Sequence, residues 1–297
     1  MVTLLDGKNL SEEILGKAKA KIEYMLKPPK LAVISTGNDP ASQVYIRNKR
    51  KACEKVGIEF EEIHFDLEAL SEQDAEKTLC ATISKLNNDT SITGILVQKP
   101  IYGISPEHED VIINMIDPNK DVDVFNKENL ANLMEGNNNL LPCTPKGVLS
   151  LLDKYNIKVE GKHIVIIGRS NIVGKPLALA LLNKNATVTI CHSKTVGLQD
   201  ICKTADILIS AVGKPKFITR DFIGFDTNVI IDVGINRDEN NKLCGDVDFE
   251  DVVELFGDMS TNNYITPVPG GVGAMTVASL IENIIDLTHK QFLKEIS

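Results

Sequence analysis

One lysine stands on an otherwise apolar helix face in the first third of the chain. The stretch DPASQVYIRNKRKACEKVG predicts a helix over about 40–56, with an Asp-Pro-Ala-Ser start and Gly57 as the residue that ends it. Steps of about 100° per residue place these residues on one face: Tyr45, Lys49, Ala52, Cys53 and Val56. The opposite side carries Arg47, Arg50, Lys51 and Glu54. Burial and nearby cations favour a neutral amine, so Lys49 could be an acid–base group. A lysine at the rim of the core with its ammonium in solvent fits the same pattern.

Polar side chains also follow a buried strand predicted over 92–98. The run ITGILVQKP ends this strand in Gln98, at the carboxyl edge where open α/β sheets carry their ligands. The later stretch PNKDVDVF supplies Asp121 and Asp123. Their place just after the first sheet suits the wall of a cleft. A loop or capping role fits either acid as well.

A glycine-containing turn in the second half has the order that holds a dinucleotide. The stretch HIVIIGRSNIVGKPLALALL contains a buried strand, Gly168, a short polar loop, Gly174 and a helix. Gly168 permits a sharp turn, and Gly174 lets the helix start pack on the strand with free N–H groups for a phosphate. Ser170 stands where the middle glycine of G-x-G-x-x-G would be, so this turn alone also fits an ordinary βα connection.

The second strand of this half ends without the acid that binds the ribose 2′-hydroxyl of NAD. Its sequence, TICHSKT, carries no Asp or Glu. Hydrogen-bond donors and positive charge are offered instead by Arg169, His192, Ser193 and Lys194. These groups suit a 2′-phosphate, so the sequence favours NADP over NAD. A solvated loop with incidental basic residues fits the same stretch.

Strand-like apolar runs alternate with helix-period segments almost throughout the chain. We expect strands at 31–36, 59–65 and 92–98, with helices at about 40–56 and 71–87. A second series of strands is expected at 163–168, 186–191, 205–211 and 228–234, with helices at about 174–184 and 197–203. The succession predicts an α/β fold: two α/β domains flank a cleft, the second is a Rossmann-type nucleotide-binding domain, and a C-terminal helix returns to the first.

The domain boundaries are expected in two stretches rich in turn residues. The segment from Asp117 to Cys143 holds the first, and Thr144 followed by Pro145 suits the N-cap and first position of a helix over about 145–155. We therefore expect a catalytic domain made of 1–143 plus 267–297, and a nucleotide-binding domain over 144–266.

The second boundary, YITPVPGGVGAMT, resembles a linker but leads to only one more amphipathic helix. That helix needs an existing core to dock on, so the chain is expected to cross back to the first domain here. Glycines at 270, 271 and 273 expose backbone groups and let a flat ring approach, while Pro267 and Pro269 stiffen the segment. The stretch is therefore predicted to be a wall of the active site.

Composition excludes several other classes of protein. The chain has 297 residues and a net charge of -9, which argues against a general nucleic-acid binder. No apolar run is long enough to span a bilayer, and the N-terminus lacks a signal pattern, so a cytoplasmic location is expected. The six scattered cysteines are expected to be buried free thiols, and the spacing of the five histidines predicts no metal site.

Eight short motifs, taken in order, resemble those of the bifunctional methylenetetrahydrofolate dehydrogenase/methenyltetrahydrofolate cyclohydrolase family. They are Tyr45-x-x-x-Lys49, GILVQ, KDVD, PCTP, GRSNIVGKP, DVGIN, GDV and TPVPGGVG-x-MT, running from about Leu5 to the final helix. The family oxidises 5,10-methylenetetrahydrofolate to the methenyl form with NADP, then hydrolyses that to 10-formyltetrahydrofolate. The resemblance implies this function in one-carbon metabolism, with tetrahydrofolate derivatives as ligands and a homodimeric state.

The resemblance also implies roles for individual residues. Lys49 would be the central catalytic group, chiefly for hydrolysis, and Gln98 would hydrogen-bond it and help to keep it neutral. Tyr45 would stack on the folate, and Asp123 would grip the pterin ring. Further substrate contacts are expected at Val97, Lys99, Pro269, Gly270, Gly271, Gly273 and Thr276. NADP contacts are expected at Thr144, Gly168, Arg169, Ser170, Ile172, His192, Ser193 and Ile235.

Three residues depart from the family's usual pattern. Lys99 follows Gln98 where the family has leucine, Val124 replaces a glycine, and Ala274 replaces a proline. Lys99 could act on Lys49 through its charge, reach the glutamate tail of a folate, or point to solvent. Because the main site residues are intact, these departures bear on substrate affinity more than on activity.

Three other functions fit parts of the same sequence. A monofunctional dehydrogenase would not need Lys49 and Gln98. A non-catalytic NADP-binding protein would leave the set of Tyr45, Lys49, Gln98 and Asp123 unexplained. An unrelated dehydrogenase acting on a small hydroxy or keto acid would need anion-binding arginines and a catalytic histidine at a strand end, and no histidine stands at a convincing one.

Overall fold

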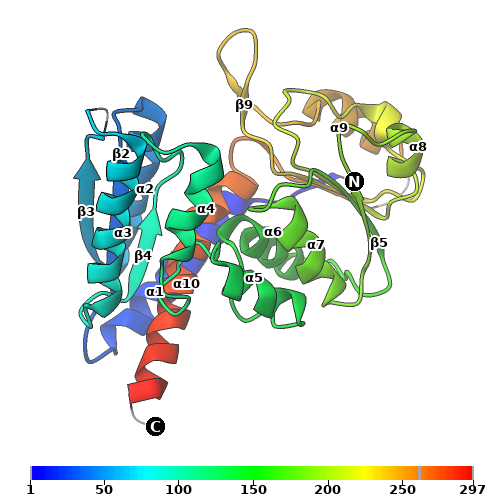
Figure 1. Cartoon of the computed structure of the whole chain (residues 1–297). Helices are drawn as coiled ribbons and strands as arrows, with labels where there is room; N and C mark the ends of the chain where they lie inside the picture. Colours follow the sequence, from blue (N-terminus) through cyan, green and yellow to red (C-terminus); the bar gives the residue numbers. More distant parts are fainter. Residues whose placement is uncertain (1, 68, 260–261, 296–297) are drawn as a thin grey trace. The chain divides into compact units, whose positions relative to one another are not determined.

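The computed structural model describes residues 2–67, 69–259 and 262–295 (Figure 1). Internal contacts divide the chain into two compact units. We call them the six-stranded unit, formed by the chain up to Glu12 and by Leu133–Thr276, and the three-stranded unit, formed by Glu13–Asn132 and the chain from Val277. Helices α1 (Gly7–Glu23) and α10 (Val272–Glu295) each contribute to both units.

The three-stranded unit is built on a parallel sheet in the order β3-β2-β4. These strands span Lys30–Thr36 (β2), Glu59–Phe65 (β3) and Gly94–Val97 (β4). Helices α2 (Pro40–Val56) and α3 (Glu72–Asn88) connect them, and α4 (Pro106–Asn114) and α5 (Lys127–Met134) follow β4. A core that includes Ile34, Leu79, Ile83 and Ile95 is fully buried between α3 and the sheet, because β2 and β4 are apolar on both faces.

The six-stranded unit has a parallel sheet in the order β1-β11-β8-β7-β5-β6. The strands are β1 (Val2–Leu4), β5 (His163–Ile167), β6 (Thr187–Cys191), β7 (Ile207–Ser210), β8 (Val229–Asp232) and β11 (Asn263–Ile265). The helices are α6 (Cys143–Lys154), α7 (Gly174–Leu182), α8 (Leu198–Cys202), the short 3-10 helix Arg220–Phe222 and α9 (Phe249–Asp258). A hairpin of β9 (Asn236–Arg237) and β10 (Leu243–Cys244) projects from this unit in Figure 1.

The strands and helices expected from the apolar runs are confirmed within one or two residues at most ends. Helix α2 occupies the predicted range 40–56. Two expectations need correction. Pro142, not Thr144, is the N-cap of α6, because its carbonyl already accepts the Lys146 N–H at 2.9 Å. In addition, the domain boundaries predicted from the sequence placed Val2–Leu4 in the catalytic domain. This strand instead pairs with β11 in the six-stranded sheet. The remaining domain bounds stay a prediction.

All six cysteines are free thiols, and four of them are buried. Among the described residues, no cluster of three metal-binding side chains occurs. None of the helices in the described part of the chain is both long and apolar enough to cross a membrane.

Candidate active site

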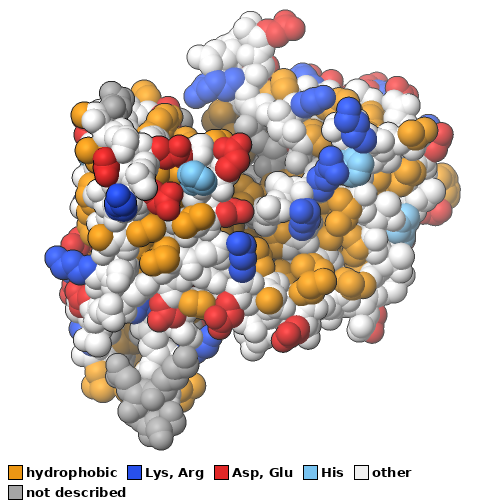
Figure 2. Space-filling view, viewed as in Figure 1, with side chains coloured by type: hydrophobic (Ala, Val, Ile, Leu, Met, Phe, Trp, Pro, Cys, Tyr) orange, Lys and Arg blue, Asp and Glu red, His pale blue; other side chains and the backbone are white. Residues whose placement is uncertain are grey.

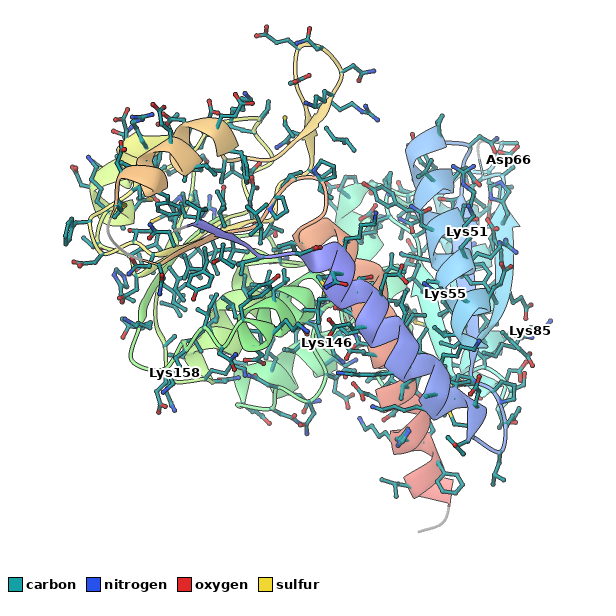
Figure 3. All side chains as sticks on the ribbon, turned by 180° about the vertical axis from the view of Figure 1, so that it is seen from behind. Lys51, Lys55, Asp66, Lys85, Lys146 and Lys158 are labelled. Carbon is teal, nitrogen blue, oxygen red and sulfur yellow. The ribbon has the colours of Figure 1, made fainter. Side chains whose placement is uncertain are left out.

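Helix α2 positions Lys49 as its sequence predicts. The Asp39 side chain accepts the Ser42 N–H at 2.7 Å at the N-cap, and Gly57 ends the helix with φ 90°. The stripe residues Ala52, Cys53 and Val56 are buried, while Tyr45 at the open end of the stripe is 51% exposed. Lys49 is half-buried one turn from Tyr45. Figure 3 shows Lys51 and Lys55 on the same helix, and both are exposed.

Lys49 meets Gln98 at the carboxyl end of β4. Its Nζ atom donates to Oε1 of Gln98 over 3.0 Å. The Gln98 backbone N–H continues the sheet ladder to the Ile34 carbonyl at 2.9 Å, and Nε2 of Gln98 donates to the Lys99 carbonyl at 2.8 Å. A carbonyl can only accept, so this second bond fixes which end of the amide faces Lys49. The predicted pair is therefore in contact, on two separate elements.

The two acids of the KDVD stretch have different environments. Asp121 is buried and accepts the backbone N–H groups of Val124 (3.0 Å) and Asn126 (2.8 Å). Burial raises the pKa of Asp121 to about 6. Asp121 is thus the loop-capping acid, and the segment it holds bridges to Ile95 of β4. Asp123, two residues later, is half-buried and remains the candidate for ligand contact.

The departures from the family pattern have visible structural effects. Val124 has φ 62°, a left-handed conformation that suits the glycine usually found there and is strained for a β-branched residue. The Lys99 ammonium pairs with Glu109 of α4 at 2.9 Å, an arrangement the sequence did not predict. Ala274 donates its N–H to the Gly271 carbonyl at 3.2 Å, which proline could not do.

The turn after β5 has the close packing expected of a nucleotide-binding turn. Gly168 has φ 138°, and a Cβ there would lie 2.5 Å from the Ala211 carbonyl oxygen. A Cβ on Gly174 would lie 2.1 Å from the Gly168 carbonyl oxygen, so only glycine lets α7 approach this strand end. The Ser170 hydroxyl accepts the N–H groups of Val173 (3.2 Å) and Gly174 (3.3 Å). Serine at the middle position therefore caps the start of α7.

Basic and polar groups from two neighbouring strands meet beside this turn. Strands β5 and β6 pair with Ile167 opposite Cys191, so Arg169 and His192 follow at adjacent strand ends. Arg169, Ser193 and Lys194 are exposed. Nδ1 of His192 accepts the Lys194 N–H at 3.1 Å, which holds the loop after β6 in a turn. The glycine cradle and these donors fit a dinucleotide with a 2′-phosphate.

Two buried acids organise the loops after β7 and β8, and sequence reasoning did not assign them a role. Asp232 accepts the N–H groups of Gly234 (2.9 Å), Asp246 (3.0 Å) and Val247 (2.8 Å). Asp246 accepts the N–H groups of Val212 (2.8 Å) and Lys214 (2.9 Å). Both acids stand in motifs that the sequence shows, Asp232 in DVGIN and Asp246 in GDV, but only the fold brings the two acids together.

The remaining predicted cofactor residues lie in the same unit. Ile235 is 51% exposed, and its side chain lies so close to Gly273 that a Cβ there would be 2.8 Å from Cδ1. Ile172 is exposed in the turn before α7, and Thr144 is half-buried in the first turn of α6.

The proline-glycine segment is packed against the start of α1 and is not a free linker. The Lys8 N–H donates to the Gly270 carbonyl at 2.9 Å, and a Cβ on Gly7 would lie 2.1 Å from the Gly271 carbonyl oxygen. Pro269 and Gly273 are exposed, and Thr276 is half-buried in α10. Val97, the other predicted contact, is buried in β4. Whether these residues touch a ligand stays a prediction.

Comparisons with known proteins agree with this geometry along the chain. A family model described as tetrahydrofolate dehydrogenase/cyclohydrolase, catalytic domain, matches residues 5–123, and the NAD(P)-binding domain of the same family matches 142–292. The bifunctional protein FolD of Agathobacter rectalis is 49% identical over 291 residues, which cover 96% of this chain and 99% of that protein.

Two solved structures are similar over nearly their whole length. The bifunctional FolD methylenetetrahydrofolate dehydrogenase/cyclohydrolase of Campylobacter jejuni is 43% identical with a TM-score of 0.89, covering 98% of this chain and 100% of that one. The Trypanosoma brucei methylenetetrahydrofolate dehydrogenase-cyclohydrolase, complexed with NADP and an inhibitor, is 30% identical with a TM-score of 0.86, covering 98% of each chain.

Proposed function

The chain belongs to the tetrahydrofolate dehydrogenase/cyclohydrolase family, and on that premise we propose how its residues share the two reactions. It is an NADP-dependent enzyme that oxidises 5,10-methylenetetrahydrofolate to the methenyl form and hydrolyses this to 10-formyltetrahydrofolate. The observation that carries the residue assignment is the 3.0 Å contact between Lys49 and Gln98 at the end of β4.

Lys49 is the acid–base group of the hydrolysis. Water adds to the methenyl carbon, and a neutral Lys49 amine takes the proton that the water loses. The bond from that carbon to N5 then breaks as the added hydroxyl loses its own proton and becomes the formyl C=O. N5 takes up one proton and the formyl group stays on N10, so of the two protons of the water one ends on N5 and one is released. Gln98 supports this role because its Oε1 accepts one N–H of the amine and leaves the nitrogen lone pair directed elsewhere.

Tyr45 and Asp123 bind the folate. Tyr45 lies one turn from Lys49 on α2 and exposes half of its surface, as a stacking platform must. Asp123 would accept the amino and ring N–H groups of the pterin with its two oxygens. The capping role of Asp121 supports this assignment, because it holds the backbone on which Asp123 stands. Val97, Lys99, Pro269, Gly270, Gly271, Gly273 and Thr276 remain predicted substrate contacts.

The turn after β5 would hold NADP, which when bound accepts the hydride that leaves the methylene carbon. Gly168 and Gly174 leave room for the pyrophosphate at the start of α7, where backbone N–H groups favour negative charge. Arg169, Ser193 and Lys194 would hold the 2′-phosphate. Hydride transfer needs two rings held face to face, so these residues contribute by positioning. Thr144, Ser170, Ile172, His192 and Ile235 are the other proposed contacts.

A turnover assay tests the proposal. The purified protein is given methylenetetrahydrofolate with NADP or NAD, and absorbance follows the formation and decay of the methenyl product. We expect formation with NADP and decay faster than in buffer alone. Formation without accelerated decay would show a monofunctional dehydrogenase. Nucleotide binding without any turnover would leave a non-catalytic NADP-binding protein.

The assembly and location of the enzyme complete the proposal. We expect a homodimer, because the family resemblance implies one. Its ligands would include polyglutamated tetrahydrofolates, and it would act in the cytoplasm. Light scattering of the purified protein measures the oligomeric state. A comparison of KM for mono- and polyglutamated substrates tests the preference for polyglutamated folates.

A further inference from the structure

Four contacts connect Glu109 of α4 with the turn that leads to the Lys49 amine. Glu109 Oε2 pairs with the Lys99 Nζ at 2.9 Å, and its Oε1 accepts the Ile101 N–H at 3.1 Å. The Lys99 carbonyl accepts from Nε2 of Gln98 at 2.8 Å, and Oε1 of Gln98 accepts from Lys49 at 3.0 Å. One carboxylate thus holds both ends of the short turn that orients the Gln98 amide.

Glu109 is well placed to hold this turn still. Its side chain is only 16% exposed, and that of Lys99 is 32% exposed, so the pair is partly shielded from solvent. Ile112 and Ile113, on the next turn of α4, are buried in the core of the three-stranded unit. The Ser105 N–H before α4 donates to Glu72 of α3 at 2.7 Å. The carboxylate therefore projects from a helix that is fixed at its start and along its buried face.

Glu109 differs from the neighbouring acidic residues in what its side chain contacts. Figure 2 shows acidic side chains gathered around a histidine over the part of the three-stranded unit where α3 and α4 lie. His108 of α4 lies 3.2 Å from Glu72 and 3.6 Å from Glu76. Glu107, two residues before Glu109, is exposed in the same helical turn. Removing its charge changes the local field without touching the turn at Lys99.

We infer that Glu109 is a positioning residue for the Lys49–Gln98 pair, acting through Lys99 and the Ile101 N–H. The inference rests on the proposed role of Lys49 in hydrolysis. This role accounts for the Lys99 departure, because the charge of the lysine is matched by Glu109. Lys99 and Glu109 then act as a pair. Loss of the Glu109 carboxylate leaves the Lys99 ammonium without this partner, close to the Gln98 amide.

The test measures methenyltetrahydrofolate hydrolysis in Glu109→Gln, Lys99→Leu, the double variant and the matched control Glu107→Gln. The turn keeps a second anchor, because the Tyr102 N–H donates to the Thr36 hydroxyl at 2.7 Å, so the variants should fold. In Glu109→Gln we expect kcat to fall about tenfold with little change in KM, since the catalytic pair is misplaced. The double variant should recover part of this loss, because no free cation remains.

Each outcome has one meaning. If the wild-type protein hydrolyses no faster than buffer, the proposed function fails and the inference with it. If the wild type is active and Glu109→Gln equals Glu107→Gln, only the inference fails. If Lys99→Leu gives no recovery in the Glu109→Gln background, the loss comes from a damaged helix and the positioning role is wrong. NADPH binding, measured by fluorescence, should be the same in all variants.

Discussion

The backbone N–H of Asp246 donates to Oδ1 of Asp232 over 3.0 Å, so two buried acids lie in direct contact within the six-stranded unit. Asp246 turns its own carboxylate toward the loop after β7, where it accepts the N–H groups of Val212 and Lys214. The pair therefore fixes two loops at the carboxyl ends of neighbouring strands. This is the edge where doubly wound sheets bind nucleotides.

The Asp232 carboxyl should make the stability of the protein fall as pH rises toward neutrality. Burial, with the charge of Asp246, raises the pKa of Asp232 to about 7. An aspartate in an unfolded chain has a pKa of about 3.9. Between these values the folded chain binds a proton that the unfolded chain lacks. The contribution of this group to the free energy of unfolding is therefore complete below about pH 4 and is lost as pH rises through about 7.

Urea unfolding of the wild type and Asp232→Asn between pH 4.5 and 8 measures this effect. The variant should be less stable by about 1–3 kcal/mol, because the asparagine NH₂ group would meet a backbone N–H that the carboxylate accepts. Wild-type stability should decline relative to the variant from pH 5 to 7 and then level off. A difference that is constant over that range would contradict the shifted pKa.

Lys49→Met should abolish methenyl hydrolysis while leaving NADP binding intact. Removing a general acid–base group typically costs roughly 10²–10⁴-fold in rate. The predicted nucleotide residues lie in the other unit, so the affinity for NADPH should not change. Lys51→Met is the matched control, because Lys51 is an exposed lysine on the same helix. Full hydrolase activity in Lys49→Met would exclude the assigned role.

Gly174→Ala should weaken NADP binding and lower stability together. The new Cβ would lie 2.1 Å from the Gly168 carbonyl oxygen, so α7 must move away from β5. Overpacking of this kind costs about 1–3 kcal/mol, and the displaced helix start would no longer present its N–H groups to a phosphate. Thermal unfolding and NADPH titration measure the two effects.

Gly257→Ala is the control for that substitution. Gly257 lies near the end of α9, where a new methyl group would have no atom within 4 Å beyond its chain neighbours and the nearby backbone of its own helix, and alanine is the better helix former. This variant should bind NADPH normally and be as stable as the wild type or slightly more so. Equal losses in both variants would mean that close packing at Gly174 is not the cause.

Local signals explain why α2 and the turn after β5 could be predicted from the sequence. Helix α2 carries its own N-cap at Asp39, its C-cap at Gly57 and an apolar stripe, so its limits depend on nearby residues alone. Gly168 and Gly174 likewise lie within one strand–turn–helix unit.

The unpredicted features depend on contacts between distant segments. Strand β1 has only three residues and no recognisable period, and it forms because β11 offers a free edge at Asn263. The pairing of Lys99 with Glu109 depends on where α4 packs after the turn. The same holds for the two buried acids of the DVGIN and GDV motifs, which lie 14 residues apart.

The preference for NADP over NAD should depend on Arg169 and Lys194. Both are exposed beside the ends of β5 and β6, and Gly168 is held there by its N–H bond of 2.9 Å to the Cys191 carbonyl. Charge-assisted hydrogen bonds to a phosphate contribute about 1.5–3 kcal/mol, so loss of one should weaken NADPH binding about tenfold or more. NADH lacks the 2′-phosphate and should bind the variants as it binds the wild type.

Titration of Arg169→Ala, Lys194→Ala and the control Lys203→Ala with NADPH and NADH measures this preference. Lys203 is an exposed lysine after α8, so its removal changes the net charge by the same amount. Higher salt should weaken NADPH binding to the wild type more than to Arg169→Ala or Lys194→Ala. Each variant has one positive charge fewer facing the 2′-phosphate, so less attraction remains for salt to screen. If NADPH and NADH lose affinity equally in both variants, these residues hold a part of the dinucleotide common to both cofactors, and the 2′-phosphate is bound elsewhere.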